Sequence, residues 1–174
     1  MLTLETERLI AVAATLEMAD AELCDRTKLE YLVGAKFPAN WPPPLNDENS
    51  MKWFQQYLKS NPDDVGWAVW YFCLKMPDKS LYVIGGGGFK GKADETGIVE
   101  IGYSIMEDRH RNGYAPEAVT ALTVWAFKNP KVKKVVAQTF PELLPSIKVL
   151  QKCGFKYAGK GFEDGTILFE FIKT

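Results

Sequence analysis

The sequence is poor in the residues that build most metal sites and nucleophilic triads. It has a single histidine, His110, and three widely separated cysteines, Cys24, Cys73 and Cys153, with no CxxC pair. One histidine excludes a site with two or three histidine ligands, and the cysteine spacing disfavours a zinc site or a disulfide framework. A Ser-His-Asp or Cys-His mechanism would have to use His110. Much hydrolytic chemistry is thereby excluded, and we expect no metal.

An excess of one charge and a long hydrophobic run are also missing. Lysine and arginine number 21 against 22 acidic residues, a net charge of -1. Duplex-binding proteins carry a strong basic excess, so nucleic acid is not an expected partner. No apolar run approaches the ~18–20 residues of a membrane span. Acidic residues precede the short apolar run near the N-terminus, which is the reverse of a secretory signal. We expect a cytoplasmic protein without a membrane partner.

What is present suits one folded domain over residues 1–174, since 47% of the residues are hydrophobic and 25% are charged. Four prolines within 38–44 predict an extended loop. The strands predicted from periodicity are 8–14, 66–75, 81–91, 97–106, 134–140 and a closing hairpin of 155–163 with 165–174. A helix is predicted after Thr15 as its N-cap, another over 28–34 that ends at Gly34, and a third through Lys59 with Asn46 or Asp47 as its cap. Two more are predicted over 116–129 and 144–154. This order predicts an α+β fold with a mixed, mainly antiparallel sheet flanked by helices.

The segment after the strand at 97–106 is the most informative for function. The loop 108–115 contains Gly113 and leads into a helix with Pro116 in its first turn. Free N–H groups at a helix start form an anion site, and Arg109 and Arg111 add positive charge. The loop matches neither GxxxxGK[ST] nor GxGxxG. The four glycines 85–88 lie within a strand pattern, where they indicate a bulge or close backbone packing.

Four segments together resemble the GNAT superfamily of N-acetyltransferases, in particular the branch that acetylates the N-termini of ribosomal proteins. They are LETERLI at 4–10, EIGYSI at 100–105, RNGYAPEAVTAL at 111–122 and PSIKVLQKCGFKYAG at 145–159. The resemblance covers nearly the whole chain, and the motifs occur in the order typical of the family.

The resemblance implies an acyl-CoA N-acyltransferase fold that binds acetyl-coenzyme A in a V-shaped gap between two splayed strands, here 97–106 and 134–140. The family's Arg/Gln-x-x-Gly-x-Gly/Ala loop maps to 110–115, with His110 in the first position. The implied coenzyme-binding residues are Ser104, Ile105, His110, Arg111, Asn112, Gly113, Tyr114, Ala115 and Pro116. Two positions depart from the family: Leu143 stands where an asparagine is common, and Leu150 where many members have a tyrosine that protonates the thiolate.

Acetyl transfer from a thioester to an amine requires a neutral amine, a donor for the oxyanion and neutralisation of the thiolate. Glu100 is the candidate base; the alternative is a strand carboxylate that faces solvent or pairs with a lysine. For the thiolate, Ser146 and Tyr114 offer hydroxyls near the motifs, although Ser146 also suits a helix start. We expect Cys153 to be a core residue rather than a nucleophile. Trp41, in the proline loop, is a candidate wall of the acceptor site.

The leading hypothesis is an acetyl-coenzyme A-dependent N-acetyltransferase acting by direct attack on a small-molecule or peptide amine, including a protein N-terminus. A second hypothesis keeps the fold without turnover, as a coenzyme A-binding homologue or sensor, because of Leu143 and Leu150. A third, an unrelated interaction domain, requires the motif set to be accidental. The sequence does not identify the acceptor, and it leaves the oligomeric state open, a homodimer included.

Overall fold

The computed structural model describes residues 1–44 and 46–173. Leu45 and Thr174, at the ends of the predicted proline loop and closing hairpin, lie outside the described residues. The strands are β1 (Thr3–Glu5), β2 (Leu9–Ala13), β3 (Val69–Lys75), β4 (Leu81–Phe89), β5 (Ile98–Ile105), β6 (Lys134–Thr139), β7 (Lys156–Lys160) and β8 (Ile167–Ile172). The α-helices are α1 (Leu16–Cys24), α2 (Arg26–Val33), α3 (Glu48–Ser60), α4 (Tyr114–Ala126) and α5 (Leu144–Lys152), and a 3₁₀ turn spans Glu107–Arg109.

The strands form one sheet in the order β1-β2-β3-β4-β5-β6-β8-β7. Neighbouring strands pair antiparallel except β5 and β6, which are parallel and are connected through α4. A parallel pair needs such a crossover, whereas the consecutive antiparallel strands β3, β4 and β5 need only short turns. The predicted class, α+β with a mixed, mainly antiparallel sheet flanked by helices, is confirmed.

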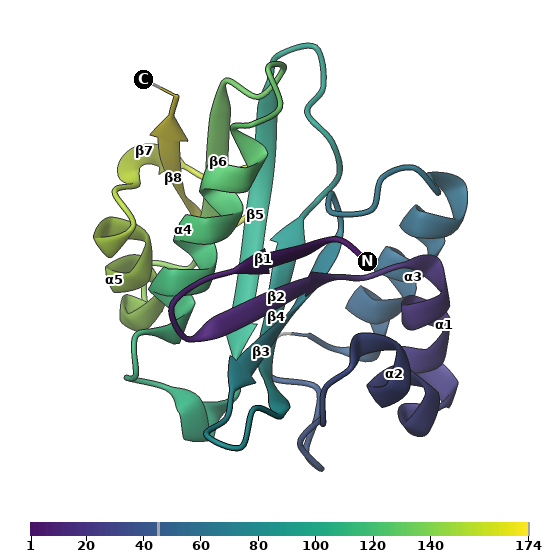
Figure 1. Ribbon diagram of the computed structural model, residues 1–174. Coiled ribbons are helices and arrows are strands. Elements are labelled where there is room, and N and C mark those ends of the chain that lie inside the picture. The colour runs from purple at the N-terminus through teal and green to yellow at the C-terminus, as the bar shows by residue number, and fades with distance from the viewer. Residues whose placement is uncertain (45, 174) are drawn as a thin grey trace.

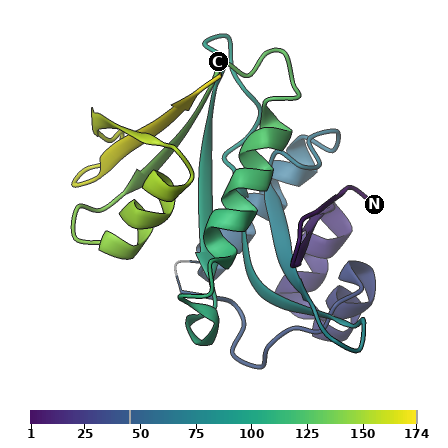
Figure 2. The ribbon, with the colours of Figure 1, turned by 60° about the vertical axis from the view of Figure 1, so that its left-hand side comes forward.

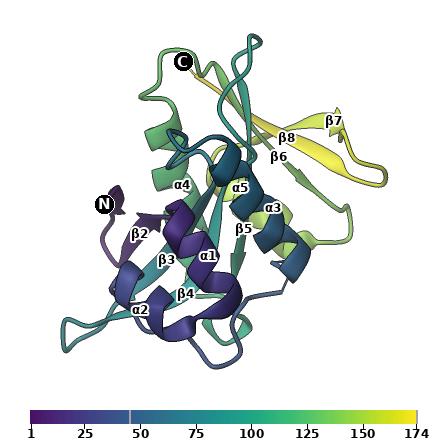
Figure 3. The same ribbon diagram turned by 90° about the vertical axis from the view of Figure 1, so that its right-hand side faces the viewer.

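Helices cover both faces of the sheet (Figures 1 and 3). On one face α4 and α5 bury residues such as Leu122 and Leu150 against the sheet. On the other face α1, α2 and α3 bury residues such as Met18, Leu29 and Leu58. We call these the α4 face and the α1–α3 face. Burial of apolar side chains on both faces is the main stabilising term for such a sheet.

Glycines 85–88 lie in β4, where the predicted bulge and close packing are both confirmed. The register between β3 and β4 shifts between Phe72 and Cys73, as in a β-bulge. A Cβ atom on Gly87 would lie 2.6 Å from the carbonyl oxygen of Gly102, and one on Gly88 would overlap the carbonyl of Ala68. These glycines therefore let the backbone of β4 approach its neighbours closely.

Several predicted boundaries are confirmed by capping contacts. Thr15 caps α1 by accepting from the amide of Met18, Asp47 caps α3 by accepting from Ser50, and Gly34 ends α2 in the left-handed conformation.

Other boundaries were wrong. The three-residue edge strand β1 was missed because so short a segment has no recognisable period. Helix α2 begins at Arg26 rather than 28, since Asp25 caps it. Helix α4 begins at Tyr114 rather than 116, and it ends at Ala126 rather than 129.

Candidate active site

Strands β5 and β6 pair over only three residues each and then separate. The register joins Ile98–Glu100 to Lys134–Val136, after which β6 continues along β8 as far as Thr139. Figure 2 shows the two strands meeting near the C-terminus and diverging toward the start of α4. Residues 101–105 therefore have no strand partner on the β6 side, and Glu100 lies at the vertex of the gap. These are the strands predicted to splay.

The alternation of hydrogen bonds along β5 decides which backbone groups face the gap. The amide of Lys90 donates to the carbonyl of Glu100 at 3.0 Å, and the amide of Met106 donates to Ile84 of β4 at 2.8 Å. Even-numbered residues of β5 thus bond to β4, and the backbones of Ile101, Tyr103 and Ile105 face the gap. Of the two β5 residues expected to bind the coenzyme, Ile105 therefore presents its amide to the gap, whereas the amide of Ser104 is turned to β4.

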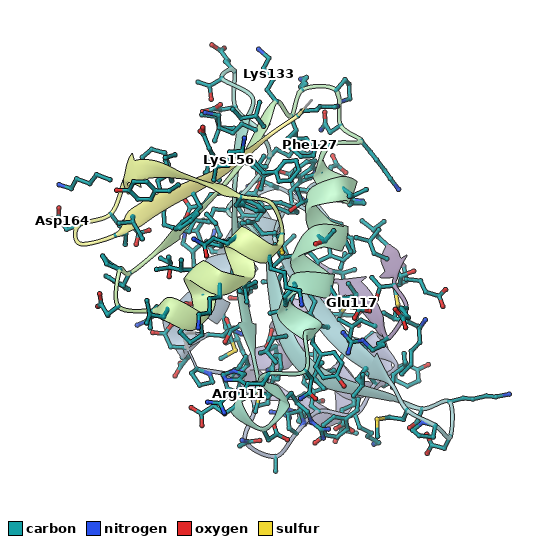
Figure 4. The ribbon with its side chains drawn as sticks, turned by 90° about the vertical axis from the view of Figure 1, so that its left-hand side faces the viewer. Arg111, Glu117, Phe127, Lys133, Lys156 and Asp164 are labelled. Atoms are coloured by element: carbon teal, nitrogen blue, oxygen red, sulfur yellow. The ribbon has the colours of Figure 1, made fainter. Side chains whose placement is uncertain are left out.

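The start of α4 is a cluster of backbone donors. Gly113, the residue before the helix, has φ 80° and offers no side-chain cap, and Arg111 is also left-handed with φ 63°. Within the described residues the N–H groups of 111–115 have no acceptor. Such free donors, together with the positive end of the helix dipole, form an anion site. This site lies at the end of α4 toward which β5 and β6 diverge (Figures 2 and 4).

Arg8 and Glu117 fix this loop to the N-terminal segment. The Glu117 carboxylate accepts from the Arg8 side chain at 2.7 and 2.8 Å, from the Arg8 amide at 2.8 Å and from the Thr6 hydroxyl at 2.6 Å. Arg8 also donates to the carbonyl of Asn112 at 2.8 Å and stacks on the ring of Tyr114. Partial burial raises the pKa of Glu117, but the bonds from Thr6 and Arg8 outweigh it and lower that pKa overall.

His110 and Asn112 serve the shape of the loop. The Nε2 atom of His110 lies 2.8 Å from the gap-facing carbonyl of Ile105, to which it donates. The side-chain amide of Asn112 donates to the carbonyls of Arg109 and His110 at 3.1 and 2.9 Å. These contacts hold 109–113 against the end of β5, so the backbone amides rather than these side chains are the free donors. Figure 4 shows Arg111 in the loop beside the start of α4.

Glu100 projects onto the α1–α3 face, where its side chain is 18% exposed and bonded to two neighbours. Its carboxylate pairs with the ammonium of Lys90 at 2.7 Å and accepts from the amide of Gln138 at 3.0 Å. Lys90 also pairs with Glu163 at 2.8 Å. The amide oxygen of Gln138 accepts three further bonds, from Phe162 N, Glu163 N and Thr166 Oγ1. Glu100 therefore has the predicted lysine partner as well as a position at the vertex.

On the α4 face, the Tyr103 hydroxyl lies 3.2 Å from the carbonyl oxygen and 3.3 Å from the hydroxyl of Ser146 on α5. The two residues connect β5 to α5 beside the gap. Ser146 lies in the first turn of α5, as the helix-start interpretation expects, but it does not cap the helix, because Leu143 precedes α5 and no side chain makes a capping bond there. Leu150 is fully buried in the core of the α4 face.

Comparison with known proteins decides the family. The profile described as "Acetyltransferase (GNAT) domain" matches residues 8–156. The chain belongs to the GNAT family of acetyltransferases. Among curated relatives, the uncharacterized N-acetyltransferase YjdG of Bacillus subtilis is 29% identical over 157 residues, which cover 89% of this chain and 90% of YjdG.

Solved structures with the same fold are similar over nearly the full length. An acetyltransferase from Agrobacterium tumefaciens has a TM-score of 0.66 at 20% identity and covers 99% of this chain and 95% of its own. The ribosomal-protein-S5-alanine acetyltransferase from Vibrio fischeri has a TM-score of 0.62 at 18% identity, covering 99% and 97%. The acetyltransferase MccE, solved with acetyl-CoA and AMP, has a TM-score of 0.61 at 13% identity, covering 97% and 94%. The predicted GNAT fold is thereby confirmed.

The proline loop of the acetyltransferase packs on the α1–α3 face beside β4 and β5. Trp41 is buried, and its indole N–H donates to Glu22 at 2.9 Å, which also accepts from Tyr71 at 2.7 Å. A Cβ atom on Gly86 would lie 3.7 Å from the Trp41 ring. The hydroxyl of Ser104 donates to the carbonyl of Pro44 at 2.5 Å. The loop therefore covers the outer part of β4 and β5 on the side to which Glu100 projects.

Cys153 of the acetyltransferase is half-buried next to α4. Its thiol donates to the carbonyl of Pro116 at 3.5 Å, and burial raises its pKa. A raised pKa keeps the thiol protonated and weakly nucleophilic.

Two further findings concern the described part of the acetyltransferase. No group of three or more His, Cys, Asp or Glu side chains is placed to hold a metal ion there. Between residues 1 and 173, Leu45 aside, none of the helices has both the length and the hydrophobicity to cross a membrane.

Proposed function

We propose that residues 1–174 act as one domain that transfers an acetyl group from acetyl-coenzyme A to a primary amine, by direct attack in a ternary complex. The observation that carries this proposal is the gap between β5 and β6, where residues 101–105 have no partner on β6 and lead to the free amides of 111–115. Membership of the GNAT family supports it.

The residues present fit the coenzyme. The free amides of 111–115 suit a pyrophosphate, and the gap-facing backbones of Tyr103 and Ile105 suit the amides of a pantetheine arm. Arg8 offsets the negative charge of Glu117 beside the anion site. Acetyl-coenzyme A would supply the activated acyl group as a thioester.

Glu100, whose side chain projects to the α1–α3 face, is the proposed base. It lies at the vertex of the gap, and Lys90 and Gln138 hold its carboxylate in place. It would accept the proton of the incoming ammonium, directly or through water, while a gap-facing amide of β5 polarises the thioester carbonyl. A hollow of about 470 Å³ adjoins Glu100 and is bordered by Lys92, Thr96 and Phe162. An amine approaching from this face would meet Glu100 before it meets the acyl group.

We propose a small-molecule or peptide amine, protein N-termini included, as the acceptor. Fold similarity to a structure named ribosomal-protein-S5-alanine acetyltransferase supports the peptide option. Purified protein should be incubated with acetyl-coenzyme A and a panel of amines, polyamines and peptides, with free thiol measured by a thiol reagent and the product mass by mass spectrometry. Thiol release matched by addition of one acetyl group to an amine supports the proposal. Coenzyme binding without turnover across the panel would favour the non-catalytic homologue that Leu143 and Leu150 suggest.

A further inference from the structure

Tyr103 is a half-buried side chain packed against the core of the α4 face, and it is not among the site residues predicted from the sequence. Among the described residues its hydroxyl has partners only on Ser146, namely the carbonyl oxygen at 3.2 Å and the hydroxyl at 3.3 Å. Neither partner carries a charge. The hydroxyl is therefore available to exchange a neutral partner for an anionic one, to which a hydrogen bond is roughly twice as strong.

The position of Tyr103 relates this hydroxyl to the proposed reaction. Tyr103 lies three residues after Glu100, within the stretch of β5 that does not pair with β6. Because side chains alternate along a strand, Tyr103 projects to the α4 face and Glu100 to the other. The anion site at 111–115 lies at the start of α4, which covers the same face of the sheet as Tyr103. A coenzyme held there and reaching toward Glu100 must pass Tyr103.

We propose that the Tyr103 hydroxyl donates a hydrogen bond to the coenzyme sulfur as the thioester is cleaved, which makes Tyr103 a catalytic residue. This inference rests on the proposed function. The C–N bond forms, the C–S bond breaks, and its electron pair stays on the sulfur. The amine proton passes to Glu100 or to water, and the thiolate later takes a proton from solvent. Leu150, which is fully buried on α5, offers no such donor.

The pKa of Tyr103 indicates that its hydroxyl donates a hydrogen bond to the sulfur rather than a proton. Burial, the largest cause, raises its pKa to about 12, with the bond to Ser146 acting in the opposite direction. A thiol has a reference pKa of ~8.5. Complete proton transfer from the phenol to the thiolate would therefore be unfavourable, whereas donation of a hydrogen bond needs no transfer. Tyr103 stays protonated throughout the working pH range.

The test compares wild type with Tyr103→Phe, which keeps the ring and removes only the hydroxyl. The loss of one hydrogen bond to a charged group predicts a kcat about 10–100-fold lower. Affinity for desulfo-coenzyme A, which has no sulfur, should stay within about twofold in both proteins. Tyr31→Phe is the matched control, since Tyr31 is 85% exposed on α2 and remote from the gap.

A readout independent of turnover is the pKa of the thiol of bound coenzyme A, followed by its thiolate absorbance. It should lie below that of free coenzyme A in wild type and rise in Tyr103→Phe. An unchanged kcat, or a bound thiol that titrates alike in both proteins, would overturn the inference. If Tyr103→Phe does not fold, the titration of wild type is sufficient as a test. A bound thiol no more acidic than that of free coenzyme A would contradict the proposal. A wild type that binds no coenzyme A would instead refute the proposed function.

Discussion

Arg8 donates two hydrogen bonds to a single carboxylate oxygen of Glu117: its Nε lies 2.8 Å and its Nη2 lies 2.7 Å from Oε2. The pair joins the start of β2 to the first turn of α4, 109 residues apart. A carboxylate in the first turn of a helix opposes binding of an anion at that helix start, unless a cation offsets it. Arg8 supplies that cation.

Removal of Arg8 should therefore weaken coenzyme A binding through the unpaired Glu117. We expect Arg8→Met to raise the Kd for coenzyme A about tenfold, or ~1.4 kcal/mol. The double variant Arg8→Met/Glu117→Gln should recover to within about threefold of wild type. Calorimetric titration of the three proteins checks this. Equal losses in the single and double variants would mean that Arg8 acts by direct contact or by folding alone.

The same carboxylate predicts a pH dependence of stability. The pKa of Glu117 in the folded protein lies below the ordinary 4.5. Its contribution is therefore complete above pH 4.5 and is lost as the pH falls through the lowered folded value. Urea unfolding should show wild type more stable than Glu117→Gln by about 1–3 kcal/mol at pH 7, with the difference shrinking between about pH 4.5 and 3. A difference that is constant down to pH 3 contradicts the lowered pKa.

Gly113→Val should abolish tight coenzyme binding. The backbone there has φ 80°, which strains a β-branched residue, and the side chain would occupy space needed by the pyrophosphate. Gly34→Val is a matched control, because Gly34 has φ 74° and open space around a Cβ atom. Both variants should lose similar stability in thermal unfolding, and only Gly113→Val should lose affinity for coenzyme A. A folded Gly113→Val protein with wild-type affinity would exclude the loop as the phosphate site.

Cys153→Ala should retain most of the turnover, because a half-buried thiol with a raised pKa is a poor nucleophile. The small cavity should cost about 1 kcal/mol of unfolding free energy. Initial rates, together with mass spectrometry of protein quenched during turnover, check this. Detection of acetylated Cys153, or loss of turnover with coenzyme binding intact, would contradict direct transfer and indicate a covalent mechanism through Cys153.

The helices and strands that position the site were predictable from local patterns: the glycine loop before α4, the strands on either side of the gap, and the caps Thr15 and Asp47. The contacts that complete the site were not. Gln138 reaches Glu100 across 38 positions and Tyr103 reaches Ser146 across 43, and nothing in either segment alone indicates its partner. Arg8 had a signal, because it lies in the segment 4–10 that resembles the family, but Glu117 as its partner required the fold.

Glu100→Gln should lower kcat about 10²–10⁴-fold with coenzyme affinity unchanged, the usual worth of a general base. The loss should shrink as the pH rises, since the amine then deprotonates without help. Asp78→Asn is a control, because Asp78 is an acidic residue on an exposed turn. A decrease of only a few-fold with an unaltered pH profile would make Glu100 a structural partner of Lys90.

The most direct test of the account is a crystal structure of the protein with coenzyme A. It should show the pyrophosphate on the amides of 111–115, the pantetheine arm along residues 101–105, and the sulfur between β5 and β6 within hydrogen-bond distance of the Tyr103 hydroxyl. Coenzyme A bound outside the gap, or β5 and β6 paired past Glu100 and Val136 with the coenzyme present, would contradict it.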